Sequence, residues 1–228
     1  MAYDFDKIAR DYDRMNRLMT AGLDRRWRRL GAQTSCLQNN AMQAGRLRSH
    51  VLDVACGTGD MVVELRKRGA TVTGVDLSEE MLAIAKRKVE SGEWKVADAE
   101  HLPFEDASFD AVTCAFGVRN FVHLEQGLGE MLRVLKPGGR MVILELATPD
   151  SPLVRPFYNL YTRHVIPWLG QRLAGSREAY TYLPRSIELF PKGESFAKIV
   201  EKVGGRAAER KLTFGVCRMY VVEKQRGR

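Results

Sequence analysis

The sequence has few cysteines, no linker-like tract and no long hydrophobic run. None of its apolar runs reaches the length that spans a bilayer, and only four of the 228 residues are cysteines. A Pro/Gly/Ser-rich linker and a secretory signal sequence before Tyr3 are also absent. We therefore expect one domain over residues 1–228, located in the cytoplasm with reduced thiols. The cysteines lack metal-ligand spacing, so no metal site is predicted. They are Cys36, Cys56, Cys114 and Cys217.

Basic residues outnumber acidic ones and give a formal net charge of +8. Many of the arginines lie near the N-terminus, at Arg14, Arg17, Arg25, Arg26, Arg28 and Arg29. Nucleic acid, an anionic membrane surface or simple solubility would each account for such a charge. No nucleic-acid-binding motif is present, so no nucleic acid partner is expected.

The segment 51–60, Val-Leu-Asp-Val-Ala-Cys-Gly-Thr-Gly-Asp, is the most informative part of the chain. An apolar strand runs into a turn in which Gly57 and Gly59 let the backbone approach a ligand closely. A dinucleotide site would have a third glycine where valine stands. Asp53 and Asp60 would repel a pyrophosphate but suit the ammonium end of an amino-acid-like cofactor. S-adenosylmethionine is therefore favoured over NAD, although a plain strand-to-helix turn also fits the glycines.

Two further acids end the next two predicted strands. Asp76 ends the strand 71–76, nineteen positions after Gly57, where a carboxylate can accept both hydroxyls of a ribose. Asp98 ends the third predicted strand and Ala99 follows it, where they suit an adenine amino group and its ring, although Asp98 also fits a simple turn cap. Three consecutive strand ends thus bring polar groups to one sheet edge, where open α/β sheets bind ligands.

Strand and helix patterns alternate along the chain, which is typical of a parallel α/β sheet. Two amphipathic helices are expected within 1–37, a loop over Gln38 to Ser49, a cofactor-binding core over 51–147 and a helical insertion over 152–190. We predict a Rossmann-like, seven-stranded, mostly parallel sheet with helices on both faces. The expected strands are 51–55, 71–76, 94–98, 109–116, 140–146, 207–213 and 216–224. The expected core helices are 60–68, 78–90, 123–135 and 194–203.

Motifs over nearly the whole chain resemble the class I methyltransferases, and more narrowly the ubiquinone/menaquinone biosynthesis C-methyltransferase family. The 51–60 loop and Lys-Pro-Gly-Gly at 136–139 occur in many methyltransferases, whereas Phe-Gly-Val-Arg-Asn at 116–120 and Tyr-Leu-Pro at 182–184 are far more specific. The resemblance implies a class I fold, S-adenosylmethionine as methyl donor and C-methylation of a polyprenylated quinol. It also implies a cofactor contact at Ala115, where serine is usual. The whole predicted cofactor site is Asp53, Gly57, Thr58, Gly59, Asp60, Asp76, Asp98 and Ala99.

Arg119 and Asn120 follow the fourth predicted strand and form the predicted catalytic pair. A quinol that loses a hydroxyl proton pushes electron density onto a ring carbon, and the oxidised quinone lacks this push. The pair is placed to stabilise the phenolate or to pass its proton through water. Because arginine stays charged, the electrostatic role is favoured for Arg119. Considered without the resemblance, Arg119 in a surface salt bridge is the competing interpretation.

Aromatic and aliphatic residues dominate 152–170, together with Arg155 and Arg163. We expect them to face a prenyl tail and the inner face of a membrane, in peripheral contact, with ordinary core packing as the alternative. The apolar set is Phe157, Tyr158, Tyr161, Val165, Ile166, Trp168 and Leu169.

The sequence leaves several alternatives open. The acceptor can be a naphthoquinol or a benzoquinol, the prenyl length is free, and a homo-oligomer is compatible with the chain. A methyltransferase for another phenolic or lipid acceptor is the second hypothesis. The third is a cofactor-binding regulatory protein without turnover.

Overall fold

The computed structural model describes residues 5–36, 49–173 and 177–225 and contains one seven-stranded sheet. The strand order is β3-β2-β1-β4-β5-β7-β6. Strands β1 to β5 run parallel, and β7 pairs antiparallel with β5 and with β6. This confirms the predicted mostly parallel sheet. The strands are β1 (His50–Val54), β2 (Thr71–Asp76), β3 (Glu93–Val96), β4 (Phe109–Ala115), β5 (Leu135–Leu146), β6 (Gly205–Leu212) and β7 (Cys217–Lys224).

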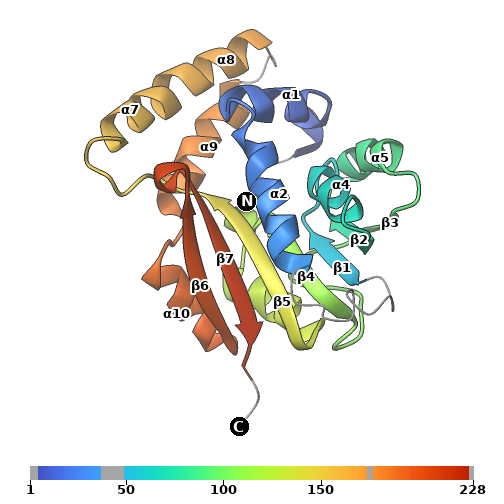
Figure 1. The fold of residues 1–228 in the computed structure, drawn as a ribbon. Helices are drawn as coiled ribbons and strands as arrows, with labels where there is room; N and C mark the ends of the chain where they lie inside the picture. Colours follow the sequence, from blue (N-terminus) through green and yellow to red (C-terminus); the bar gives the residue numbers. More distant parts are fainter. Residues whose placement is uncertain (1–4, 37–48, 174–176, 226–228) are drawn as a thin grey trace.

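Helices cover both faces of the sheet (Figure 1). On one face lie α2 (Leu23–Cys36), α4 (Asp60–Arg66) and α5 (Glu79–Lys88), and on the other lie α6 (Leu124–Arg133) and α10 (Glu194–Lys202). Each helix buries an apolar stripe against the strands, as amphipathic helices do. Ser78 caps the helix after β2, because its Oγ accepts a hydrogen bond from the Met81 amide.

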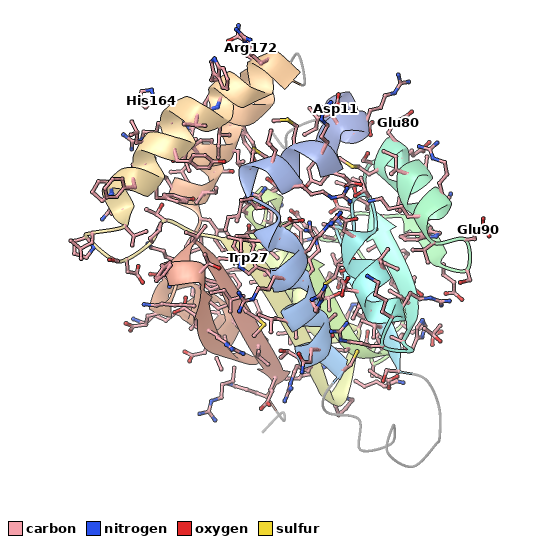
Figure 2. The ribbon with its side chains drawn as sticks, turned by 45° about the horizontal axis from the view of Figure 1, so that its top comes forward. Asp11, Trp27, Glu80, Glu90, His164 and Arg172 are labelled. Carbon is pink, nitrogen blue, oxygen red and sulfur yellow. The ribbon has the colours of Figure 1, made fainter. Side chains whose placement is uncertain are left out.

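A second group of helices lies over the carboxyl ends of the parallel strands. It consists of η1 (Phe5–Ile8), α1 (Ala9–Met19), α7 (Arg155–Leu160), η3 (Tyr161–Val165), α8 (Ile166–Leu173) and α9 (Arg177–Leu189). Buried Ile8, Met15 and Ile166 join the N-terminal helices to α8. Figure 2 shows His164 and Arg172 on the outer side of this group, while Trp27 lies between α2 and the sheet. We refer to these helices as the helical cap.

The strand order reverses at β1. The chain passes from β1 to β2 and β3 on one side and then crosses to β4 on the other side. Ligands of open α/β sheets bind in the crevice that forms at such a switch point, outside the carboxyl ends of the strands. The fold therefore predicts a ligand site at the loops that follow β1, β2, β3 and β4.

The start of β5 differs from the sequence prediction. Helix α6 ends at Arg133, and β5 begins at Leu135 rather than at Arg140. Leu135 is fully buried and pairs with Phe109, after which the Lys-Pro-Gly-Gly motif bulges and pairing resumes between Arg140 and Ala111. A buried apolar residue on each side of the bulge keeps the strand in register. The expected loop before β1 lies outside the described residues, apart from Ser49.

No helix within the described ranges is long and apolar enough to cross a membrane. All four cysteines are unpaired. Among the residues that the structure describes, no group of three or more potential ligands is arranged to hold a metal ion.

Candidate active site

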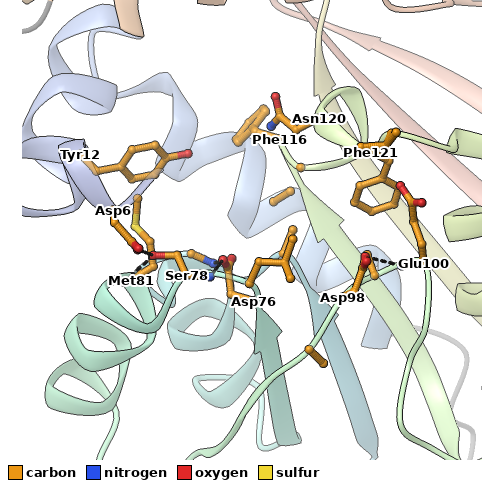
Figure 3. Close-up of a pocket in the computed structure, with 18 residues that line it drawn as sticks. Asp6, Tyr12, Asp76, Ser78, Met81, Asp98, Glu100, Phe116, Asn120 and Phe121 are labelled. Atoms are coloured by element: carbon orange, nitrogen blue, oxygen red, sulfur yellow. Dashed lines mark hydrogen bonds between the residues drawn. The ribbon is translucent and has the colours of Figure 1, made fainter. Parts of the chain in front are cut away.

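A cavity of about 290 Å³ opens at the switch point of the sheet (Figure 3). Its floor comes from the segments after β1, β2 and β3, and its far wall from the turn after β4. Asp6 and Tyr12 of the helical cap also line it. A site of this size with few polar groups and many apolar walls is typical of a small-molecule pocket.

Asp76 stands at the end of β2 and organises one side of the cavity. Its Oδ2 accepts a hydrogen bond of 2.7 Å from the Gly57 amide, and its Oδ1 accepts one of 2.9 Å from the Ser78 amide. Burial raises the pKa of Asp76 above its ordinary value, while these backbone donors act in the opposite direction. The carboxylate thus joins the β1 loop to the β2 loop and lines the cavity between them.

The glycine loop leaves space for a ligand. Gly57 has a φ of +54° and lines the cavity, and a Cβ atom built on it would meet no atom within 4 Å. Gly59 has a φ of +80° and supports the start of α4 behind the loop. Positive φ explains why glycine suits both positions. The open space beside the Gly57 backbone, next to the Asp76 carboxylate, fits a nucleoside-type cofactor such as S-adenosylmethionine.

Asp98 and Ala99 line the opposite end of the cavity, after β3. Asp98 Oδ1 accepts a hydrogen bond of 2.9 Å from the Glu100 amide, which holds the loop in a tight turn. Ala115, where serine is usual, also faces the cavity from β4. The small side chains of Ala99 and Ala115 leave room for a flat ring beside the Asp98 carboxylate.

Thr58 and Asp60 lie behind the glycine loop rather than along the cavity wall. Thr58 donates a 2.5 Å hydrogen bond to Asp13 of α1, and Asp60 pairs with Lys88 of α5 at 2.7 Å. Lys88 also pairs with Asp13. The bonds from Lys88 and the nearby arginines outweigh burial, so the pKa of Asp60 lies below its ordinary value. This network ties the N-terminal helix to the glycine loop.

Asp53 is completely buried inside β1 and also lies outside the cavity lining. Its Oδ1 accepts a 2.6 Å hydrogen bond from the Thr113 hydroxyl, while Oδ2 has no partner among the described residues. Burial raises the pKa of Asp53 to about 7, and the Thr113 hydroxyl acts in the opposite direction. An acid in this condition is close to changing its charge near neutral pH.

The turn after β4 forms the far wall of the cavity. Phe116, Asn120 and Phe121 line it, and the short helix η2 (Val118–Asn120) carries the predicted pair. The Asn120 amide oxygen accepts a 3.1 Å hydrogen bond from the Tyr182 hydroxyl. In Figure 3 the aromatic rings of Phe116 and Phe121 stand on either side of the asparagine's segment.

Arg119 is not among the residues that line the cavity, and its side chain is buried rather than at the surface. Its side chain is 5% exposed and pairs at 2.8 Å with Glu145, which is 1% exposed. Its Nη1 also donates to the Phe116 carbonyl, and its backbone amide donates to Glu145 Oε2 at 3.2 Å. Burial opposes the charge of Arg119, but Glu145 outweighs it, so the pKa lies above its ordinary value. The pair clamps the turn that carries Asn120.

Five of the ten predicted site residues line the cavity: Gly57, Asp76, Asp98, Ala99 and Asn120. The other five are not among the lining residues; they are Asp53, Thr58, Gly59, Asp60 and Arg119. Sequence reasoning missed Tyr12, because the pattern of the N-terminal segment indicated only an amphipathic helix. It also missed Glu145, whose signal was a lone acid in an otherwise apolar strand.

Comparisons with known proteins show to which family the chain belongs. A model of the ubiE/COQ5 methyltransferase family matches residues 2–224. The chain belongs to this family. The demethylmenaquinone methyltransferase of Deinococcus radiodurans is 43% identical over 227 residues, which cover 97% of this chain and 91% of that protein. The ubiquinone/menaquinone biosynthesis C-methyltransferase UbiE of Geobacter sulfurreducens is 44% identical over 230 residues, covering 96% and 86%.

Solved structures agree on the fold. An S-adenosylmethionine-dependent methyltransferase from Thermotoga maritima superposes with a TM-score of 0.61 at 19% identity and covers 97% of this chain and 100% of that one. At this identity the match speaks for the fold alone. Together with family membership, it confirms the Rossmann-like methyltransferase fold, the enzyme class and the S-adenosylmethionine cofactor that the sequence predicts.

Proposed function

We propose that the protein methylates a ring carbon of a polyprenylated quinol in menaquinone or ubiquinone biosynthesis, with S-adenosylmethionine as donor. The observation that carries this proposal is one continuous cavity that joins the Asp76 and Gly57 end to the Asn120 turn, in a chain of this family. Relatives named for demethylmenaquinone support the naphthoquinol as acceptor.

In this proposal one end of the cavity binds the cofactor and the other end binds the acceptor. Asp76 accepts the ribose hydroxyls, Asp98 takes the adenine amino group, and the Gly57 backbone lies against the amino-acid end. Asp53 and Asp60 contribute negative charge behind the loop, which favours an ammonium group. Thr58 and Gly59 hold the loop in place. The bound cofactor supplies an already activated methyl group.

The acceptor side must hold a ring carbon in line with that methyl group and exclude water. Phe116 and Phe121 offer apolar faces to the ring, and Asn120 lies beside it. Arg119, clamped behind the turn, favours the negative charge that develops on the ring oxygen as its proton leaves. The helical cap would then shield the reacting atoms from water.

Methyl transfer is expected to require the reduced acceptor, because only the quinol can push electron density onto the attacking carbon. Purified protein with S-adenosylmethionine and demethylmenaquinone in vesicles should form methylated product after addition of a chemical reductant, and none under oxidising conditions. Mass spectrometry of the quinone fraction gives the readout. The variant Asp76→Ala serves as a control, since it loses a charged hydrogen-bond acceptor worth roughly 1.5–3 kcal/mol.

Other outcomes separate the alternatives. Equal rates with the oxidised quinone would contradict the carbon-nucleophile mechanism. Methylation of simple phenolic or lipid acceptors but of no quinol would favour the second hypothesis. Cofactor binding without transfer to any acceptor would favour a regulatory protein.

We also propose that the enzyme works on the cytoplasmic face of the membrane through α7 and α8. The exposed apolar side chains of this segment are Leu153, Phe157, Leu160, Val165 and Trp168. Exposed Arg155 lies on α7, exposed Arg163 on the intervening η3 and exposed Arg172 on α8. An apolar stripe with arginines beside it suits an anionic interface, where each basic residue contributes about 1 kcal/mol.

The stripe differs from the one expected from the sequence. Tyr158 and Tyr161 are half-buried and Ile166 is buried, because they share the inward side of the helix with Thr162. The Tyr161 hydroxyl donates to the Met19 carbonyl at 3.1 Å. The side chain of Leu169 lies outside the described set. Of the expected apolar set, the outward side therefore carries Phe157, Val165 and Trp168, and exposed Leu153 and Leu160 extend it.

Flotation with anionic vesicles should retain the protein at low salt and release most of it at high salt. Trp168→Ala and Leu160→Ala should weaken retention, since each removes apolar surface from the interface. Leu77→Ala is the matched control, because Leu77 is 63% exposed and Leu160 is 61% exposed, yet Leu77 lies at the cavity mouth. Full recovery in the soluble fraction at low salt, with prenylated quinol in the vesicles, would refute the membrane proposal.

A further inference from the structure

Tyr182 of α9 makes the contact by which the helical cap reaches the reacting end of the cavity. Its hydroxyl donates to Asn120 Oδ1 at 3.1 Å, and α9 packs on η2. The two residues lie 62 positions apart in the sequence. The bond therefore depends on the cap being seated over the turn after β4.

This bond determines which half of the amide faces the cavity. A primary amide carries an acceptor oxygen on one arm and two N–H donors on the other. With its oxygen engaged by Tyr182, Asn120 keeps both donors for a ligand. Figure 3 shows the Asn120 oxygen turned away from Asp76 and Asp98, with the nitrogen on their side. We propose that Tyr182 is a positioning residue, which orients Asn120 to donate to the acceptor's ring oxygen.

The chemistry of the acceptor makes this orientation matter, and here the inference rests on the proposed function. A quinol oxygen gains negative charge as its proton leaves, and N–H donors stabilise that charge. An amide turned the other way would present a carbonyl oxygen and repel it. The χ2 torsion of asparagine is broad and roughly two-fold, so an untethered amide can adopt either orientation. Arg119 does not line the cavity, and its Nη1 already donates to Glu145 and to the Phe116 carbonyl, whereas Asn120 lines the cavity and can donate directly to a ligand.

Tyr182→Phe tests the proposal, with Tyr161→Phe as the matched control. Each variant removes one hydroxyl from the cap, and each lost hydrogen bond is 3.1 Å long, but Tyr161 donates to the Met19 carbonyl instead. Quinol methylation by Tyr182→Phe should fall about 10- to 100-fold in kcat, the range expected for a misplaced catalytic contact. Its affinity for S-adenosylmethionine, measured by calorimetry, should remain within about two-fold of wild type, since a cap hydroxyl distant from the cofactor loop adds nothing to that affinity. Tyr161→Phe should keep its kcat.

Asn120→Asp provides the second arm. Aspartate keeps an oxygen for the Tyr182 hydroxyl and nearly the same shape, but it has no N–H donors. We expect it to lose more activity than Tyr182→Phe. In an Asn120→Ala background, Tyr182→Phe should cause no further loss, because a residue that acts through another is not additive with it.

The outcomes are distinct. Wild-type kcat in a folded Tyr182→Phe protein, an equal loss in the Asn120→Ala background, or an active Asn120→Asp protein would each overturn the positioning role. If wild type itself methylates no quinol, the proposed function fails instead. Thermal unfolding of every variant checks that the cap remains folded.

Discussion

Replacing Arg119 by alanine should lower the turnover of quinol methylation by about 100-fold, because the turn that carries Asn120 loses the side chain that holds it and the acceptor end loses a positive charge. The affinity for S-adenosylmethionine should change much less, because Arg119 lies at the acceptor end and outside the cavity lining. Its charge reaches both Tyr12 and Tyr182, which flank that end. Steady-state kinetics and calorimetry on the same preparation separate the two effects.

The single variant should also be destabilised, which calls for a control. Arg119→Ala leaves Glu145 charged and 1% exposed without its partner, and breaking a buried pair in this way costs about 3–5 kcal/mol. The double variant Arg119→Ala with Glu145→Gln removes both charges and should recover most of that loss. If the double variant folds and still turns over at the wild-type rate, Arg119 has only the structural role of clamping the turn.

Most of the sheet could be predicted from local patterns. The strand around Leu52 and the one around Val72 are short apolar runs that end in glycine or acid, so their parallel pairing follows from the helix between them. The start of β5 could not be predicted, because Leu135 belongs to the helical pattern before it. Only its pairing with Phe109, 26 positions away, makes it a strand residue.

The cavity lining was predictable where a strand end carried the signal, as for Asp76 and Asp98. It was not predictable for Tyr12 or Tyr182, whose positions depend on how the cap packs on the sheet. The same holds for Arg119, since sequence alone does not tell that Glu145 on the adjacent strand would bury it. Side chains that meet over long sequence separations need the tertiary structure to be found.

Asp53→Asn should make the folded protein more stable at neutral pH, an uncommon result for a residue of the cofactor loop. Burial raises the pKa of Asp53 from 3.8 to about 7, so the folded state binds this proton more tightly than the unfolded state does. The free energy of unfolding should therefore fall as pH rises from about 4 to about 7 and then level off. The shift corresponds to about 4 kcal/mol, at about 1.4 kcal/mol per pKa unit.

Asparagine keeps an oxygen for the Thr113 hydroxyl and does not titrate, so Asp53→Asn should lose this pH dependence. Urea unfolding of both proteins at several pH values should give curves that converge near pH 4 and separate, with the variant above, toward pH 7. Asp110→Asn is the matched control with the opposite sign. Hydrogen bonds from Lys136 and the His50 amide outweigh burial and hold the pKa of Asp110 below its ordinary value, so its stabilisation is present at neutral pH and lost on acidification.

The cofactor gives a further check on Asp53. If its charge favours the ammonium end of S-adenosylmethionine, saturating cofactor should flatten the pH dependence of wild type, because the ligand then favours the ionised carboxylate. The variant should bind the cofactor less tightly while unfolding at higher urea. Identical pH slopes for wild type and Asp53→Asn would contradict the raised pKa. Equal cofactor affinities would remove Asp53 from the binding site and leave it a structural acid of β1.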